Sequence, residues 1–308
     1  MEFSENALNI LTVRTFPQKG PAWIDKHLRG NEETDVLCSL LETHEYEFMK
    51  KREIVETAIN RVESSVDGIV AIGDPLFPFL RGKVKPADKP FALFYRGDIS
   101  LLSKDNLNIA VIGVLNPDEK IEITEKVVTA EILKYKATIV SGLALGCDTI
   151  AHRTALDNLG KTIAILPSPL DYIIPKENAE LAELIVQNGG LLISEYYNNP
   201  KSRNDMISRF VVRDRLQAMF SDAVLLAASY APNNLGNDCG SRHAMEKAKA
   251  YGIKRGVVYN ENKHHDNPMY DLNRQILRDD RTVIRIDSAN MKETVQKLVT
   301  KTSEQFLF

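Results

Sequence analysis

Runs of consecutive apolar residues recur from residue 108 onward, and a helix-length segment separates each run from the next. The runs have the length of strands and cover residues 108–113, 137–142, 162–167, 191–195, 223–228 and 255–259. Strands that are apolar throughout are typical of a parallel sheet whose two faces are both covered by helices. The pattern predicts a doubly wound, Rossmann-like α/β fold with a mostly parallel sheet. Residues 282–286 are expected to form a last strand and residues 291–299 a closing helix.

The first third of the chain has a different pattern. Apolar positions recur at three- and four-residue spacing in 23–28, 34–41 and 48–62, which predicts helices, and no strand is expected before residue 67. Residues 68–102 contain short β-rich runs broken by proline and glycine, which predicts strands and turns. We therefore expect a helical N-terminal module at 1–66, followed by a Rossmann-like domain at 67–308.

The amino-acid composition says little about function. The 308 residues carry a net charge of −3, so an anionic partner would have to bind a local cluster of basic residues. The three cysteines, Cys38, Cys147 and Cys239, are far apart, which indicates neither a disulfide framework nor a zinc site. No signal peptide and no apolar run long enough to span a bilayer stand out, so we expect a cytoplasmic protein without membrane contact.

The loop SGLALGCDTIAH, residues 141–152, is the most informative candidate site. Gly142 and Gly146 permit a tight turn and a close backbone approach, and the N–H groups at the start of the following helix suit a phosphate. A tight turn without a ligand explains the same pattern equally well. Asp148 is expected to cap the helix rather than contact a ligand, and His152 is expected to pack against the sheet.

Other segments add basic and aromatic side chains. Gly240 and Ser241 begin a helix in NDCGSRHAMEKA, residues 237–248, and form either a second anion site or a plain capped surface helix. Residues 201–215 are locally basic, which fits a phosphate backbone or a solvated helix face. Tyr172, Tyr196 and Tyr197 lie near these loops and could stack bases, although most tyrosines only pack.

Signatures of catalysis are absent from the sequence. It contains no GxSxG, no HExxH, no P-loop and, after the first strand, no GxGxxG. We therefore expect no catalytic residue, no metal and no cofactor.

Several of these segments together resemble one family. SGLALGCDTIAHRTAL is similar to the signature of the DNA-processing protein A (DprA/Smf) family, SGxAxGID followed by AAHxxAL. The resemblance continues, in the family's order, through GKTIAILPSPLDYIIPKENAEL, LLISEYY, FVVRDRL, CGSRHAMEKA and MYDLNRQIL, and it covers roughly residues 67–290. The helical start resembles the family's N-terminal SAM-like module.

The resemblance implies a protein that binds single-stranded DNA through a basic pocket, forms a homodimer and helps to load the recombinase RecA during natural transformation. The implied mechanism is electrostatic capture by Lys176, Arg213 and Arg215, with N–H groups of the Gly142–Gly146 loop gripping a phosphate. The positions that match the family's motifs are Ser141, Gly142, Gly146, Asp148, His152, Lys176, Asn178, Phe210, Arg213, Arg215, Gly240 and Ser241.

Three positions depart from the family pattern, and one of them is Cys147, which replaces the isoleucine of the family's GID. Leu115 stands where the family usually has an arginine in its first loop, and Asp214 replaces the asparagine of its RNR motif. The loss of an arginine favours a second hypothesis, a nucleotide-sensing domain of the wider SMF/DprA–LOG group that binds a small nucleotide in the same cleft. A third, a LOG-like phosphoribohydrolase, lacks its PGGxGTxxE signature here.

Overall fold

The computed structural model describes residues 1–30, 32–233 and 240–301. Within these residues ten strands form one sheet in the order β1-β2-β3-β7-β6-β5-β4-β8-β9-β10. The strands are β1 Glu2–Phe3, β2 Gly68–Ala71, β3 Ala92–Gly97, β4 Asn108–Ile112, β5 Thr138–Ser141, β6 Thr162–Leu166, β7 Leu191–Ser194, β8 Ala223–Leu226, β9 Lys254–Val258 and β10 Ile284–Ile286. Only the pairs β2–β3 and β3–β7 are antiparallel, so the predicted Rossmann-like, mostly parallel sheet is confirmed.

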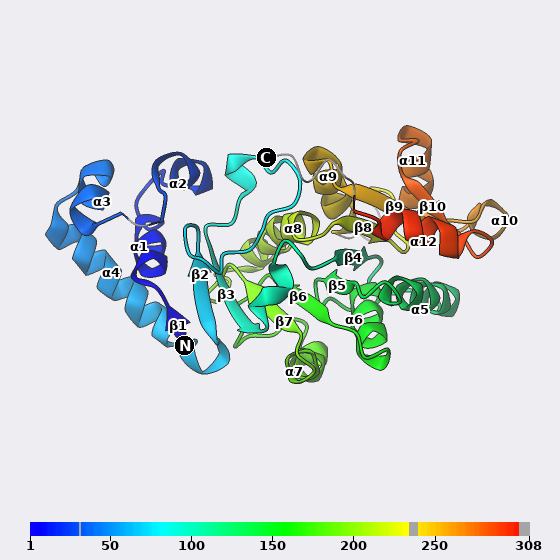
Figure 1. Cartoon of the computed structure of the whole chain (residues 1–308), viewed down its shortest axis with the longest axis horizontal. Coiled ribbons are helices and arrows are strands. Elements are labelled where there is room, and N and C mark those ends of the chain that lie inside the picture. The colour runs from blue at the N-terminus through cyan, green and yellow to red at the C-terminus, as the bar shows by residue number, and fades with distance from the viewer. Residues whose placement is uncertain (31, 234–239, 302–308) are drawn as a thin grey trace.

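Helices cover both faces of the sheet. In Figure 1, α8 and α9 lie above the strands and α5, α6 and α7 lie below them. The helices are α1 Glu5–Val13, α2 Pro21–His27, α3 Thr34–Leu41, α4 Glu45–Asn60, α5 Glu119–Leu133, α6 Cys147–Asp157, α7 Ala179–Gln187, α8 Arg203–Met219, α9 Ser241–Tyr251, α10 Glu261–His264, α11 Asp271–Asp279 and α12 Met291–Val299. None of the described helices is both long and apolar enough to cross a membrane.

The chain winds outward from the middle of the sheet in two directions. It runs from β4 through β5 and β6 to β7, and then returns to the other side of β4 to add β8, β9 and β10. The order of the strands therefore reverses between β4 and β8. In open α/β sheets, ligands bind at the carboxyl ends of the strands beside such a reversal.

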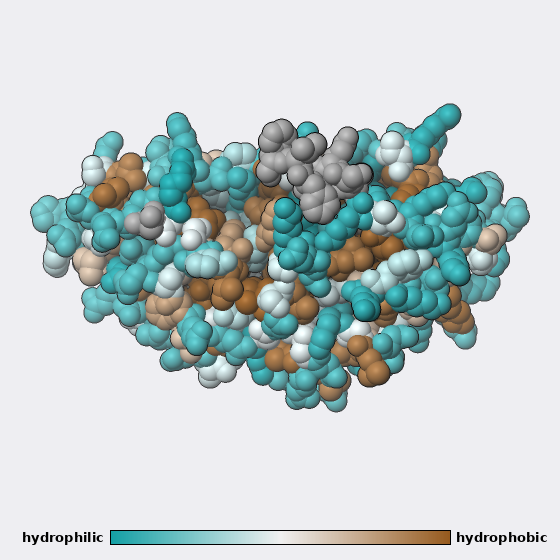
Figure 2. Space-filling model, in the orientation of Figure 1, coloured by the Kyte–Doolittle hydropathy of each residue, from teal (hydrophilic) through white to brown (hydrophobic). Residues whose placement is uncertain are grey.

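The N-terminal helices pack on the β2–β3–β7 end of the sheet (Figure 1). Leu8 of α1 and Phe48 of α4 belong to the same buried cluster as Phe94 of β3 and Leu192 of β7. On the face seen in Figure 2, apolar side chains gather along the middle of the molecule, and hydrophilic side chains surround them. The division of the chain at residue 66 stays a prediction.

The expectation that no strand precedes residue 67 is wrong, because Glu2 and Phe3 pair in parallel with Gly68 and Ile69. Two residues are too short to show an alternating pattern, and their pairing partner is distant in sequence. Cys38 and Cys147 are free and buried, whereas Cys239 lies outside the described residues.

Candidate functional site

A pocket of about 510 Å³ lies where the strand order reverses; we call it the switch-point pocket. The loops after β4, β5 and β6 form one wall, and α8 and the start of α9 form the other. Apolar side chains dominate its entrance, where Leu115 is 49% exposed. Five of the expected site residues line the pocket: Asp148, Phe210, Arg213, Gly240 and Ser241.

The Gly142–Gly146 loop folds around the carboxylate of Asp148. Oδ2 of Asp148 accepts hydrogen bonds from the backbone N–H groups of Gly142 and Ala144, at 3.1 and 3.2 Å. Asp148 therefore does not cap α6 as expected; the N-cap is Gly146, without a side-chain bond. The implied mechanism requires these two N–H groups to be free to bind a phosphate. Both already donate to the Asp148 carboxylate, so they are not free.

The two glycines are required by close contacts inside the protein. A Cβ at Gly142 would lie 1.4 Å from an Nη of Arg213, so only glycine lets this guanidinium cross the loop. Gly146 has a φ of +72°, and a Cβ there would lie 2.4 Å from the carbonyl oxygens of Val114 and Leu115. The loop after β5 is thereby held against the loop after β4.

An arginine between two carboxylates forms the polar floor of the pocket. Arg213 is 4% exposed, and its guanidinium donates to the carbonyl oxygen of Ile165 at 2.9 Å and lies 3.2 Å from Oδ1 of Asp214. Burial raises the pKa of Asp214 to about 7; Arg213 opposes the shift and Asp148 adds to it. Burial also raises the pKa of Asp148, against the attraction of Arg213. Arg213 is thus offset by Asp148 and Asp214, and the floor offers no net positive charge above pH 7.

Three of the expected site residues, including Ser241 of the lining, connect the elements around the pocket. Ser141 donates to the carbonyl oxygen of Val111 at 2.7 Å and ties β5 to β4. Asn178 donates to the carbonyl oxygens of Leu143 and Ala144 and fixes the loop after β6 against the Gly142–Gly146 loop. Ser241 donates to the carbonyl oxygen of Gly113 at 2.9 Å and connects α9 to β4. These three side chains hold the walls together.

Two expected ligand residues do not reach the pocket. His152 is fully buried, 2.6 Å from the hydroxyl of Thr162, and burial lowers its pKa to about 3. It packs as a neutral side chain, as the alternative interpretation expected. Arg215 points to the other side of α8, where both of its Nη atoms bind the carboxylate of Glu195 at 2.7 Å. Neighbouring arginines on a helix face different directions, so Arg213 and Arg215 cannot act as one cluster.

Lys176 is not among the residues that line the pocket, although it is adjacent to them in sequence. It begins a short 3-10 turn, Lys176–Asn178, directly after the pocket residue Pro175. Lys176 is exposed and, within the described part of the chain, forms no ion pair. Sequence reasoning missed Gln217, which also lines the pocket. The signal was its position four residues after Arg213, on the same face of α8.

Asp214 gives the pocket a pH dependence that a neutral side chain should remove. Because its folded-state pKa of about 7 lies above the ordinary 3.8, the folded protein keeps a proton that the unfolded chain loses. The free energy of unfolding therefore falls as pH rises from about 4 to about 7 and stays low above that. We expect Asp214→Asn to stabilise the protein above pH 7 by up to about 4 kcal/mol, with the gain shrinking toward zero near pH 4. Urea unfolding across pH checks this, and an advantage that is equal at both ends of the range would contradict it.

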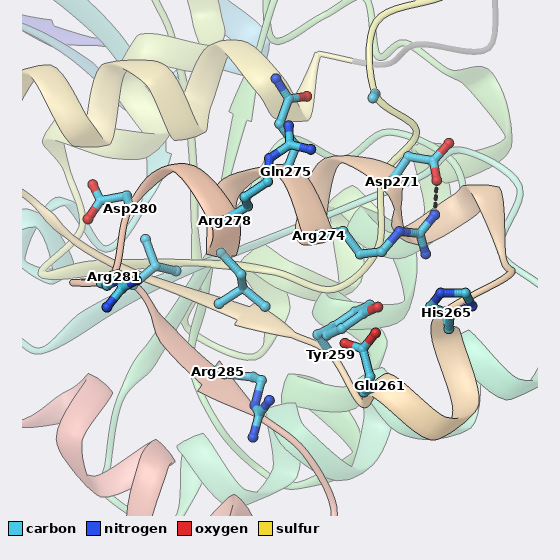
Figure 3. Close-up of a pocket in the computed structure, with 13 residues that line it drawn as sticks. Tyr259, Glu261, His265, Asp271, Arg274, Gln275, Arg278, Asp280, Arg281 and Arg285 are labelled. Carbon is cyan, nitrogen blue, oxygen red and sulfur yellow. Dashed lines mark hydrogen bonds and ion pairs between the residues drawn. The ribbon is translucent and has the colours of Figure 1, made fainter.

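A second hollow, of about 840 Å³, lies beside α10, α11 and β10 and contains four arginines (Figure 3). Arg274 is paired with Asp271, and Asp280 at the rim is paired with the buried Arg255. Arg278 and Arg285 point in opposite directions in Figure 3. The guanidinium groups therefore do not converge on one anion, and the switch-point pocket is the stronger candidate.

The strand order, the glycine loops and the pocket at the reversal define a Rossmann-like protein with a strand-end binding pocket. The model of the family described as DNA recombination-mediator protein A matches residues 68–277. This is more than half of the chain, and the chain belongs to that family.

Individual relatives agree with this assignment. The chain is 30% identical over 192 residues to protein Smf of Borreliella burgdorferi, covering 61% of this chain and 56% of that protein. It is 35% identical over 163 residues to DNA processing protein DprA of Streptococcus pneumoniae, covering 53% of this chain and 54% of that protein. The chain spans about half the length of the curated relatives it matches.

Solved structures share the fold. DprA of Streptococcus pneumoniae superposes with a TM-score of 0.72 at 22% identity, covering 97% of this chain and 99% of that one. DprA of Helicobacter pylori, whose structure concerns its single-stranded DNA binding mode, gives a TM-score of 0.58 at 27% identity, covering 75% and 95%. The resemblance read from the motifs is therefore confirmed.

Proposed function

We propose that this protein binds single-stranded DNA at the switch-point pocket and performs no covalent chemistry. The observation that carries the proposal is that five motif residues from three separate segments meet there: Asp148, Phe210, Arg213, Gly240 and Ser241. The Helicobacter pylori relative, described by its single-stranded DNA binding mode, supports the choice of ligand. By the same family resemblance we propose a cytoplasmic homodimer that passes the strand to RecA.

The contacts differ in part from those that the family motifs imply. Arg215 is engaged by Glu195, and Arg213 is offset by Asp148 and Asp214, so the exposed Lys176 becomes the main phosphate contact. The ring of Phe210 on one wall and the side chains of Leu115 and Leu145 on the opposite wall give the pocket apolar surfaces that suit the face of a base. In this arrangement the phosphates bind at the edge of the pocket, and a base enters the pocket itself.

A small nucleotide is the second candidate ligand. Leu115 adds no charge to the wall, and a volume of about 510 Å³ is within the range of small-molecule sites. A free nucleotide that displaces a labelled oligonucleotide at micromolar concentration would favour this alternative.

Salt dependence tests phosphate binding directly. Each neutralised phosphate of a single strand contributes about −0.7 to the slope of log affinity against log salt. We expect Lys176→Ala to weaken binding and to flatten the slope by about one such contact, without changing base preference. Leu115→Arg should strengthen binding and steepen the slope.

The measurement is fluorescence anisotropy of a labelled oligonucleotide across a salt series. Lys50→Ala is the matched control, because Lys50 is an exposed lysine on α4. If the parent binds no oligonucleotide even at low salt, the DNA proposal fails and the nucleotide-binding alternative replaces it.

A further inference from the structure

A groove of about 700 Å³ lies between the end of α1 and the loop that joins β7 to α8. We call it the aromatic groove, because Phe91, Tyr196 and Tyr197 line it together with the basic residues Arg14, Lys201 and Arg209. None of the proposed contacts in the switch-point pocket uses these six residues.

Cations and rings alternate along the groove. The guanidinium of Arg14 lies 5.5 Å from the centre of the Phe91 ring, and that of Arg209 lies 4.2 Å from the centre of Tyr196. The ring of Tyr197 packs against Phe94 of β3, with 5.5 Å between ring centres. The three rings are half-buried, so the sheet and α8 hold them in place while part of each stays accessible.

The positive charge of the groove is available to a ligand. Arg14 and Lys201 are exposed and, among the described residues, have no acidic side chain as an ion-pair partner. The two acidic residues of the groove are already occupied: Glu195 binds Arg215, and Asp205 binds Arg209. Burial raises the pKa of the Tyr196 hydroxyl to about 12, so this group adds no negative charge near neutral pH.

The aromatic groove and the switch-point pocket lie on different sides of α8. Ile207 and Phe210 line the pocket, whereas Ser208 and Arg209, on the adjacent face of the same helical turn, line the groove. Both hollows therefore border the first turns of α8. A strand that leaves the pocket would reach the groove by crossing the exposed side chains of Ile207, Val211 and Val212 on this helix.

We propose that the aromatic groove is a second section of the single-strand track and holds nucleotides that extend beyond the switch-point pocket. This inference rests on the function proposed above. A basic groove with accessible rings matches single strands, since unpaired bases can stack on aromatic side chains while phosphates meet cations. Arg14 and Lys201 bind phosphates, and Phe91 and Tyr197 receive bases. A duplex fits less well, because its bases are not free to stack.

The test measures affinity against oligonucleotide length. Labelled oligothymidylates of about 4 to about 24 nucleotides bracket the usual site size of single-strand binding folds. We expect the doubly substituted Arg14→Ala, Lys201→Ala protein to bind the longest strand about tenfold more weakly than the parent, with a flatter salt slope, and the shortest strand equally well. Phe91→Leu should weaken long-strand binding about fivefold or more, because it removes the ring. Phe91→Tyr keeps a ring and should bind the long strand as the parent does.

Controls separate the groove from general charge effects. Arg285→Ala removes an exposed arginine from the hollow of Figure 3 and should leave both affinities unchanged. Thermal unfolding should show the Arg14 and Lys201 variants folded like the parent.

The outcomes distinguish the two proposals. If the parent binds oligonucleotides but the groove variants bind every length as the parent does, the groove inference fails and the pocket proposal stands. An equal loss for short and long strands would also overturn a separate second section. If the parent binds no strand of any length at low salt, both proposals fall.

Discussion

Replacing Gly146 by valine is expected to destabilise the protein by at least about 3 kcal/mol and to abolish ligand binding under conditions where the parent binds. The backbone at Gly146, with φ +72° and ψ −126°, lies in a region that is open mainly to glycine. A side chain there also meets two backbone carbonyl oxygens at 2.4 Å, and backbone cannot move aside as a flexible side chain can. Both effects separate the two loops that form one wall of the pocket.

Two other glycines make the matched controls for this experiment. Gly252 has a φ of +73° but lies in the ordinary left-handed region, with ψ +22°, and a Cβ there meets nothing within 4 Å, so Gly252→Val reports the milder strain of a positive φ without a clash. Gly20 is equally open and has no positive φ, so Gly20→Val reports neither effect. The urea unfolding midpoint should be highest for Gly20→Val, lower for Gly252→Val and lowest for Gly146→Val. A Gly146→Val protein as stable as Gly252→Val would contradict the clash argument.

The sequence predicted the parts of the fold that carry a repeating local pattern. The apolar runs after residue 108 became strands, and the predicted helices 34–41 and 291–299 are α3 and α12. It missed α1, although the helix carries the same kind of pattern: Glu5, Asn6 and Asn9 share one face and are the residues of α1 that are not buried. With nine residues the helix shows this pattern over only about two and a half turns. Its start is fixed by a cap, because the Ser4 hydroxyl accepts a hydrogen bond from the N–H of Ala7.

The site was predictable at the level of which loops meet, but not at the level of which atoms face the ligand. Motif spacing placed Asp148 and Arg213 near the strand ends, where they lie. It could not show that the Asp148 carboxylate binds the loop N–H groups, or that Arg215 leaves the pocket for Glu195. Such partners are distant in sequence, and side-chain direction on a helix depends on packing.

Two of the three departures from the family pattern, Leu115 and Asp214, line the same pocket. One lacks a positive charge and the other adds a carboxylate beside Arg213. Both therefore shift the potential of this pocket in the negative direction, so we expect phosphate contacts at Lys176 and in the aromatic groove rather than inside the pocket. This is why Leu115→Arg and Asp214→Asn are informative together: each restores one component of the charge that the family pattern implies.

Arg215→Ala is expected to lower the free energy of unfolding by about 3–5 kcal/mol, while the affinity of the folded protein stays nearly unchanged for a strand too short to enter the aromatic groove, which Glu195 lines. The Glu195 side chain is 8% exposed, and its carboxylate would lose both Nη partners of Arg215 in a place that water reaches poorly. The double variant Arg215→Met, Glu195→Leu should regain much of the loss, because an apolar pair of similar size leaves no buried charge behind. Lys176→Ala should behave in the opposite way, with stability within about 0.5 kcal/mol of the parent and weaker binding. Urea unfolding and anisotropy on the same preparations separate the two roles. Normal stability with lost binding in Arg215→Ala would identify Arg215 as a ligand contact and contradict the arrangement described here.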